Sequence, residues 1–336
     1  NNIMVGSEAG YMNTTGLNNI GVGVGAGRSN VGNDNIFIGH QSGYNSADVN
    51  KNIFIGSGSG YNNKEGESNI LIGSDAGYNS NVDSNLMIGF RAGYSTTNGG
   101  SNIFIGNQAG KQNVTGGENI MMGYLAGSAG GTDTLGNIFI GKEAGKATTT
   151  DNNIYIGKQS GKANTSGNDN IFIGVDSGLA NLIGSDNVFI GPRTGKANLG
   201  NDNIFIGSYA GTANTSGKDN IFIGTNSGLA NLIGKNNICV GPQTGKASTG
   251  NDNVFIGSSA GTATTTGKDN IFVGTNSGLV NLTGENNIFV GPQTGKASLA
   301  NDNIFIGSSA GTATTSGTKN IFVGTNSGLV NLTGEN

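Results

Sequence analysis

A pattern of one amide, three apolar residues and one glycine recurs along the whole chain and is clearest at 303–307, Asn-Ile-Phe-Ile-Gly. Variants of this pattern occur twenty times, at intervals of 16 or 17 residues and once of 18. Each copy has Gly four positions after the Asn, then Ala, Ser or Thr at plus seven and Gly at plus eight. Because β-branched and aromatic residues are bounded here by turn formers, each copy predicts a short strand.

The remainder of each repeat, such as 262–269, is rich in Thr, Asn, Gly and Asp, which predicts turns and leaves room for a second short strand. The Gly-x-x-(Ala/Ser/Thr)-Gly segment predicts a tight corner, since Gly permits positive φ and close backbone approach. One repeat is too small to bury its own apolar face, so neighbouring repeats must stack. The sequence therefore predicts an all-β fold, a parallel β-solenoid of twenty coils with about 17 residues in each.

Stacking places equivalent positions of successive repeats in columns. The invariant Asn column should form a ladder in which side-chain amides bond from coil to coil. We predict this structural ladder for Asn203, Asn220, Asn237, Asn253 and Asn270.

Side chains alternate between the two faces of a strand, so the two Ile/Val columns point one way and the Phe column points the other. Both faces need burial, and a coil of about 17 residues has little room for two large apolar columns. The Phe column is then buried either in a wide coil interior or against a partner chain; we favour the partner chain and expect the column to be an assembly stripe. Its members are Phe205, Phe222, Phe255, Phe272, Phe289, Phe305 and Phe322.

Two regions differ in regularity. Residues 1–152 contain degenerate coils, whereas 153–336 follow a super-repeat of 50 residues built from repeats of 17, 17 and 16. We expect one continuous elongated domain. Because the chain opens directly on a repeat and closes as if another copy followed, we also expect it to be a segment of a longer protein.

Composition and charge narrow the function. The chain has 63 Gly but no Gly at every third position, so it is not collagen-like. Its 17 basic and 21 acidic residues are sparse and balanced, which predicts no nucleic-acid partner and no membrane contact by this segment. No apolar run approaches the length of about 20 residues that a membrane span needs.

Motifs that would indicate catalysis, phosphate binding or metal binding are weak in this chain. The segment 191–196 (Gly-Pro-Arg-Thr-Gly-Lys) lacks the spacing and the Ser/Thr of a phosphate-binding loop, and we interpret it as a corner. The Asn-Asp-Asn triplets, such as 201–203, offer one carboxylate each, which favours turn chemistry over calcium binding. His40 and Cys239 are single and belong to no catalytic set. We predict no enzyme activity, no cofactor and no metal.

A tyrosine column occupies position plus nine in the first coils, where it could stack on sugar rings or pack the corner; packing is favoured. This possible ligand face consists of Tyr11, Tyr44, Tyr61, Tyr78 and Tyr94. Thr-rich turns such as 262–266 suggest ice binding as a further hypothesis, but ice binding needs Thr in register on consecutive coils, and the following coils lack it.

The repeat, with Ile-Gly-x-x-(Ala/Ser)-Gly as at 306–311, resembles the head domains of trimeric autotransporter adhesins (YadA-like) and, more closely, the Asn-x-x-Ile-Gly-x-x-Ala-Gly arrays of phage-type tail fibres and large bacterial surface proteins. Adhesin-head repeats are shorter than these. The resemblance implies a left-handed parallel β-roll that trimerises along its length on a cell surface or virion.

These observations predict an extracellular, non-catalytic fibre shaft that acts as a rigid spacer or surface adhesin. One alternative is a subunit of an extracellular filament or matrix polymer, and another is a flank-binding carbohydrate- or ice-binding module. The expected partner is a second copy, in a homotrimer or an end-to-end homopolymer, with a cell-surface glycan or host receptor as a further candidate.

Overall fold

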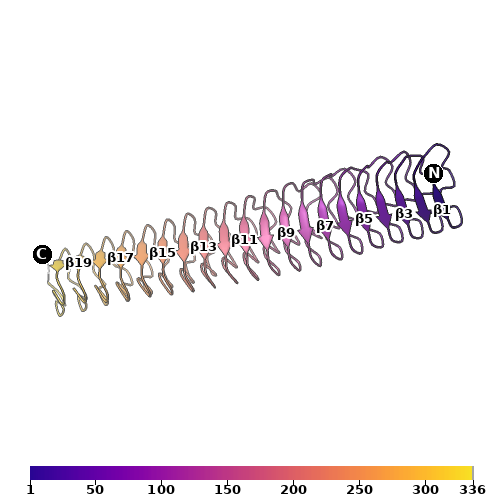
Figure 1. Cartoon of the computed structure of the whole chain (residues 1–336). Coiled ribbons are helices and arrows are strands. Elements are labelled where there is room, and N and C mark those ends of the chain that lie inside the picture. The colour runs from indigo at the N-terminus through magenta and orange to yellow at the C-terminus, as the bar shows by residue number, and fades with distance from the viewer. Residues whose placement is uncertain (335–336) are drawn as a thin grey trace. The chain divides into compact units, whose positions relative to one another are not determined.

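The computed structural model describes residues 1–334, and within them it contains parallel strands and turns but no helix. Two compact units divide the chain, 1–169 and 170–336, and each is a β-solenoid with one strand per coil. Figure 1 shows the strands of each unit side by side along its coils. The prediction of an all-β parallel solenoid is confirmed. No described segment forms a helix long and apolar enough to cross a membrane.

Each strand is three residues long and coincides with the apolar part of one repeat. The first unit contains β1 (Ile3–Val5), β2 (Ile20–Val22), β3 (Ile36–Ile38), β4 (Ile53–Ile55), β5 (Ile70–Ile72), β6 (Leu86–Ile88), β7 (Ile103–Ile105), β8 (Ile120–Met122), β9 (Ile138–Ile140) and β10 (Ile154–Ile156). The second contains β11 (Ile171–Ile173), β12 (Val188–Ile190), β13 (Ile204–Ile206), β14 (Ile221–Ile223), β15 (Ile238–Val240), β16 (Val254–Ile256), β17 (Ile271–Val273), β18 (Ile288–Val290), β19 (Ile304–Ile306) and β20 (Ile321–Val323).

Equivalent residues of successive repeats pair directly in both units. In β13 and β14, for example, Phe205 pairs with Phe222, and the flanking Ile residues pair likewise. The change between 16- and 17-residue repeats does not disturb this register, as the β12–β13 pairing across a 16-residue interval shows. Length variation is therefore absorbed in the turns.

Glycine ends each strand because the backbone turns sharply where the next coil lies close. Gly207 has a φ of 128°, and a Cβ there would lie 2.7 Å from the carbonyl carbon of Gly224 in the following coil. A side chain at this position would be strained by φ and would also clash with backbone. This steric limit explains why every repeat has Gly at plus four.

The core of the coils contains the central residue of each strand, most often Phe, and here the sequence-based placement was wrong. The expected assembly stripe lies inside its own coil: Phe205, Phe222, Phe255, Phe272, Phe289 and Phe305 are fully buried within the single chain, and Phe322 is half-buried. The physical reason is the glycine at plus eight. A Cβ on Gly211 would lie 2.4 Å from the ring of Phe205, so the glycine creates the room that the ring fills.

The rest of the coil contains no second strand within the described residues, contrary to the possibility left open by the sequence. Backbone hydrogen bonds between coils continue there nevertheless, for example from Ala213 N to Leu229 O at 3.0 Å and from Thr215 N to Leu232 O at 2.9 Å. The coils are thus joined on more than the strand side.

Candidate functional site: ladders and outer surfaces of the coil

The invariant asparagines form a buried hydrogen-bonded ladder in each unit. In the second unit both the backbone N and the Nδ2 of each Asn donate to Oδ1 of the Asn one coil earlier, at 2.9–3.1 Å and 3.0–3.3 Å respectively. This ladder includes Asn203, Asn220, Asn237, Asn253 and Asn270, all at most 1% exposed. The first unit has an equivalent ladder, with a backbone N–Oδ1 bond at every step from Asn2 to Asn153.

Most ladder amides also close their own coil. The Nδ2 of Asn220 donates to the carbonyl of Gly234 at 2.8 Å, and that of Asn270 donates to Gly284 at 2.8 Å. The start of the strand is thereby tied to the turn that completes the same coil. An unpaired amide at this depth would cost about 1–3 kcal/mol, so the position tolerates few other side chains.

Hydroxyl groups at plus seven add further links between coils. Ser227 Oγ donates to the carbonyl of Cys239 at 2.9 Å, and Thr244 Oγ1 donates to that of Gly257 at 2.6 Å. The Phe rings stack beside them: Phe205 and Phe222 have centroids 4.8 Å apart and planes 5° apart. Three sets of contacts thus hold neighbouring coils at a fixed spacing.

The outer face of the strands is aliphatic throughout. The first and third residues of all twenty strands are Ile, Val, Leu or Met, which makes forty positions without a polar residue. These side chains point out of the coil and remain partly accessible, for example 38% at Ile204 and 37% at Ile223. We call these two columns the aliphatic face. The alternation of side chains correctly predicted that these columns face away from the Phe column. The expectation that the Phe column lies outside the coil and these columns inside was the reverse of the structure.

The two borders of the aliphatic face differ in charge in the second unit. The residue before each ladder Asn is exposed, and the column consists of Asp186, Asp202, Asp219, Asn236, Asp252, Asp269, Asn286, Asp302 and Lys319. The residue after the glycine that ends each strand is uncharged in every described coil of this unit. That second column consists of Val175, Pro192, Ser208, Thr225, Pro242, Ser258, Thr275, Pro292, Ser308 and Thr325.

The tyrosine column is a stack on another side of the first unit. Tyr44, Tyr61, Tyr78 and Tyr94 lie with successive centroids 5.3, 4.8 and 5.2 Å apart and nearly parallel rings. Arg28 fills the coil between Tyr11 and Tyr44, with its guanidinium 5.3 Å from each ring centroid. Because each inner ring covers its neighbour's face, mainly ring edges are presented outward, and Tyr11 alone is 70% exposed.

Charged clusters join coils in the first unit. Glu143 accepts hydrogen bonds from Lys162 at 2.8 Å and Gln159 at 2.7 Å, and Lys146 lies 3.4 Å from its second oxygen. These donors, chiefly Lys162 and Gln159, lower the pKa of Glu143 from 4.5 to about 2. The hydrogen bond from Arg28 to Glu8 raises the pKa of the guanidinium. Both clusters are structural contacts between neighbouring coils.

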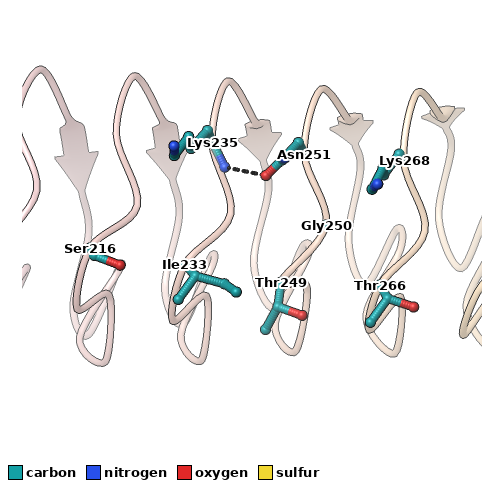
Figure 2. Close-up of a pocket in the computed structure, with 8 residues that line it drawn as sticks. All are labelled: Ser216, Ile233, Lys235, Thr249, Gly250, Asn251, Thr266 and Lys268. Atoms are coloured by element: carbon teal, nitrogen blue, oxygen red, sulfur yellow. Dashed lines mark hydrogen bonds between the residues drawn. The ribbon is translucent and has the colours of Figure 1, made fainter.

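A surface pocket lies over a 16-residue coil of the second unit (Figure 2). Its lining comes from four successive coils and consists of Ser216, Ile233, Lys235, Thr249, Gly250, Asn251, Thr266 and Lys268. The backbone N of Lys235 donates to Oδ1 of Asn251 at 2.9 Å. A related pocket 50 residues later has Glu285 and Thr318 where this one has Lys235 and Lys268. The pocket therefore recurs with the super-repeat, whereas its charge does not.

The other candidate residues are dispersed. Asp202, Asp252 and Asp302 of the Asn-Asp-Asn triplets adopt φ of 58–59° in turns. Cys239 replaces Phe in the buried column, and burial raises the pKa of its thiol. His40 lies exposed on the surface. Across residues 1–334, no three His, Cys, Asp or Glu side chains gather as they would around a metal ion.

Comparison with protein-family models, curated proteins and solved structures found no match for this chain.

Proposed function

We propose that this chain is a non-catalytic, extracellular structural shaft that serves as a rigid spacer or surface adhesin. The observation that carries the proposal is the unbroken Asn ladder within each unit. Every coil of a unit is bonded to the next through buried amides, and most of these amides also close their own coil. A coil cannot tilt against its neighbour without breaking hydrogen bonds that have no access to water.

Rigidity is the property that a spacer requires, and stacked aromatic rings contribute to it. The Phe rings add face-to-face contacts beside the ladder, and aromatic pairs are worth about 0.5–1.5 kcal/mol each beyond area burial. In the described residues, the strands are joined by short turns of similar length in each repeat, and none of these is a long loop that could close over a substrate. These features support a mechanical function better than a catalytic one.

A distance measurement within the second unit tests rigidity. Nitroxide labels on Ser216→Cys and Ser316→Cys would lie on exposed turns six coils apart, which corresponds to about 29 Å at the strand spacing. When labelled chain is diluted into an excess of unlabelled chain, only label pairs within one copy contribute, and a rigid shaft then gives one narrow distance distribution by double electron–electron resonance. A broad distribution would contradict the spacer function. Buried Cys239 should stay unlabelled, because burial keeps its thiol protonated.

Location is tested separately. Antibodies raised against the chain should label intact source cells or virions as strongly as permeabilised ones. Labelling that requires permeabilisation would contradict the extracellular assignment while leaving the rigidity result unaffected.

Self-association is part of the proposal. Its support is the aliphatic face, since a contiguous apolar surface of this kind marks an interaction site, and this one lies along the side of the coils, where copies would meet laterally. The homotrimer and the end-to-end homopolymer expected from the sequence are the other arrangements, and the tests of association below distinguish them from a lateral pair. Flank binding of a carbohydrate or ice is the second proposal in another class. The stacked Tyr rings favour packing over sugar stacking, because their faces are covered by each other.

A further inference from the structure

The aliphatic face requires an explanation beyond folding. The strands of adjacent coils pair residue for residue, yet the side chains of the face stay partly accessible, with 38% exposed at Ile204, 40% at Ile256 and 41% at Ile271. Thr has a similar β-branched shape and high strand propensity, and it is common in the turns of this chain. It occupies none of the forty outward positions of the strands. Strand formation alone would permit Thr, so it does not account for an outward face that is aliphatic at every position.

We propose that the aliphatic face pairs with the same face of a second copy, with the two stacks side by side and running in the same direction. This inference rests on the proposed structural function and names the surface through which copies associate. Two flat sheet faces pack at about 10 Å with their side chains interdigitated. Such a pair removes both columns of both copies from water.

The area is sufficient for a stable pair. In the second unit, eleven of the twenty outward side chains are 36–68% exposed and the other nine are half-buried, so together they expose on the order of 1,000 Å² of aliphatic surface. A soluble monomer tolerates roughly 300–600 Å² in one patch, and a standard interface buries about 800 Å² per partner. The face of a single unit therefore exceeds what a monomer exposes and matches what a partner covers.

The repeat spacing favours a second copy of this chain as the partner that covers the aliphatic face. The columns advance by one strand spacing per coil, so a partner matches the face along its length only if its own side chains advance equally. Another copy does so without further adjustment. A lipid surface fits poorly, because surface-lying segments carry Lys and Arg beside their apolar face. The border here is acidic, with Asp202, Asp219 and Asp252 exposed along it.

Charge at the borders selects the direction. When the two-fold axis runs along the stack, the start of each strand faces the end of the partner's strand. The Asp column then lies opposite the uncharged column that contains Pro192, Ser208 and Thr225. When the axis is perpendicular to the stack and lies in the plane of the face, Asp column meets Asp column. Repulsion between like charges disfavours that second arrangement.

The first test measures mass by sedimentation across concentration. The wild-type chain should sediment as a dimer. The variant Ile204→Thr, Ile206→Thr, Ile221→Thr, Ile223→Thr keeps β-branched side chains but should raise the dimer dissociation constant by about 100-fold or more. The matched control is Leu232→Thr, Ile233→Thr, since these residues are 45% and 58% exposed but lie on a turn away from the face. The control should leave the mass unchanged.

Circular dichroism checks that each variant is folded. If the four-substitution variant unfolds, the two-substitution form Ile221→Thr, Ile223→Thr is measured in its place. A monomeric wild type at about 100 μM, a trimer, or equal dissociation of the control would each overturn the paired arrangement. None of these results bears on rigidity, because the diluted labels report only distances within one copy.

The second test measures direction. One nitroxide on Thr325→Cys, exposed near the border of the face, gives a single label per copy. Stacks that run in the same direction bring the two labels together, within about 30 Å. Stacks that run in opposite directions, with their second units in register, separate them by the nine strand spacings between β11 and β20, about 43 Å. The short distance supports the proposal, and the long one overturns it.

Discussion

The Nδ2 of Asn220 lies 3.1 Å from the Oδ1 of Asn203, its equivalent one coil earlier. Its own Oδ1 accepts from the backbone N and Nδ2 of Asn237, at 3.0 and 3.1 Å. One side chain thus serves two junctions and its own coil at once. The amide is suited to this because it both donates and accepts, which a carboxylate or an ammonium group cannot do.

Replacing Asn220 by Ala should lower the free energy of unfolding by about 2–4 kcal/mol, since the partners in Asn203 and Asn237 lose buried bonds. Urea denaturation measures the change. The control is Thr225→Ala in the same coil, whose exposed side chain should cost less than about 0.5 kcal/mol. Equal costs for the two variants would refute the role of the ladder.

Replacing Gly228 by Ala should destabilise the chain by about 2 kcal/mol or more. Gly228 has a φ of 55°, and a Cβ there would lie 2.4 Å from the ring of Phe222. A double-mutant cycle with Phe222→Leu separates the two causes. Leu eases the clash, since a Cβ on Gly77 would lie 2.8 Å from the equivalent Leu71, but it leaves the backbone strain. The double variant should therefore be more stable than the sum predicts, by about 0.5 kcal/mol or more. Strict additivity would show that the ring does not set the requirement for glycine.

The coil length, the strands and the columns could be predicted from sequence because they depend on period alone. Asn220 repeats at the spacing of Phe222, and a period of two along the strand separates Phe222 from Ile221 and Ile223. The inside of the coil could not be predicted by the same argument. Period two says that two faces differ, but it does not say which one is enclosed.

The signal that identifies the inside was present but was assigned only to the corner. Gly228 follows Phe222 by six residues, and because it has no side chain it leaves room for the ring, as its equivalents do in other coils. A large residue paired with an invariant glycine at fixed spacing indicates a buried contact across the coil. The charge of the face borders follows from sequence too, but its meaning depends on which columns point outward.

Replacing Tyr61 by Ala should cost about 2 kcal/mol, because its ring stacks between Tyr44 at 5.3 Å and Tyr78 at 4.8 Å. Tyr61→Phe keeps the ring and should stay within about 0.5 kcal/mol of the wild type. Thermal unfolding compares the two variants. A large loss in Tyr61→Phe would mean that the hydroxyl, and not the stack, stabilises this side of the coil.

The cluster around Glu143 should make the stability of the first unit depend on acid. Its folded-state pKa is lowered from 4.5 to about 2 by Lys162, Gln159 and Lys146, so the folded chain holds this proton more weakly than the unfolded chain. The stabilisation is therefore present above pH 4.5 and is lost as pH falls from 4.5 towards 2. Glu143→Gln should reduce stability at pH 7 by about 0.5–1 kcal/mol and remove this part of the acid dependence.

Lys162→Met, which keeps the apolar stem but not the charge, should flatten the same part of the profile, because Lys162 contributes most to the lowered pKa of Glu143. Urea denaturation between pH 2 and pH 7 measures both variants. If they retain the wild-type difference between pH 4.5 and pH 2, the acid sensitivity arises elsewhere in the unit.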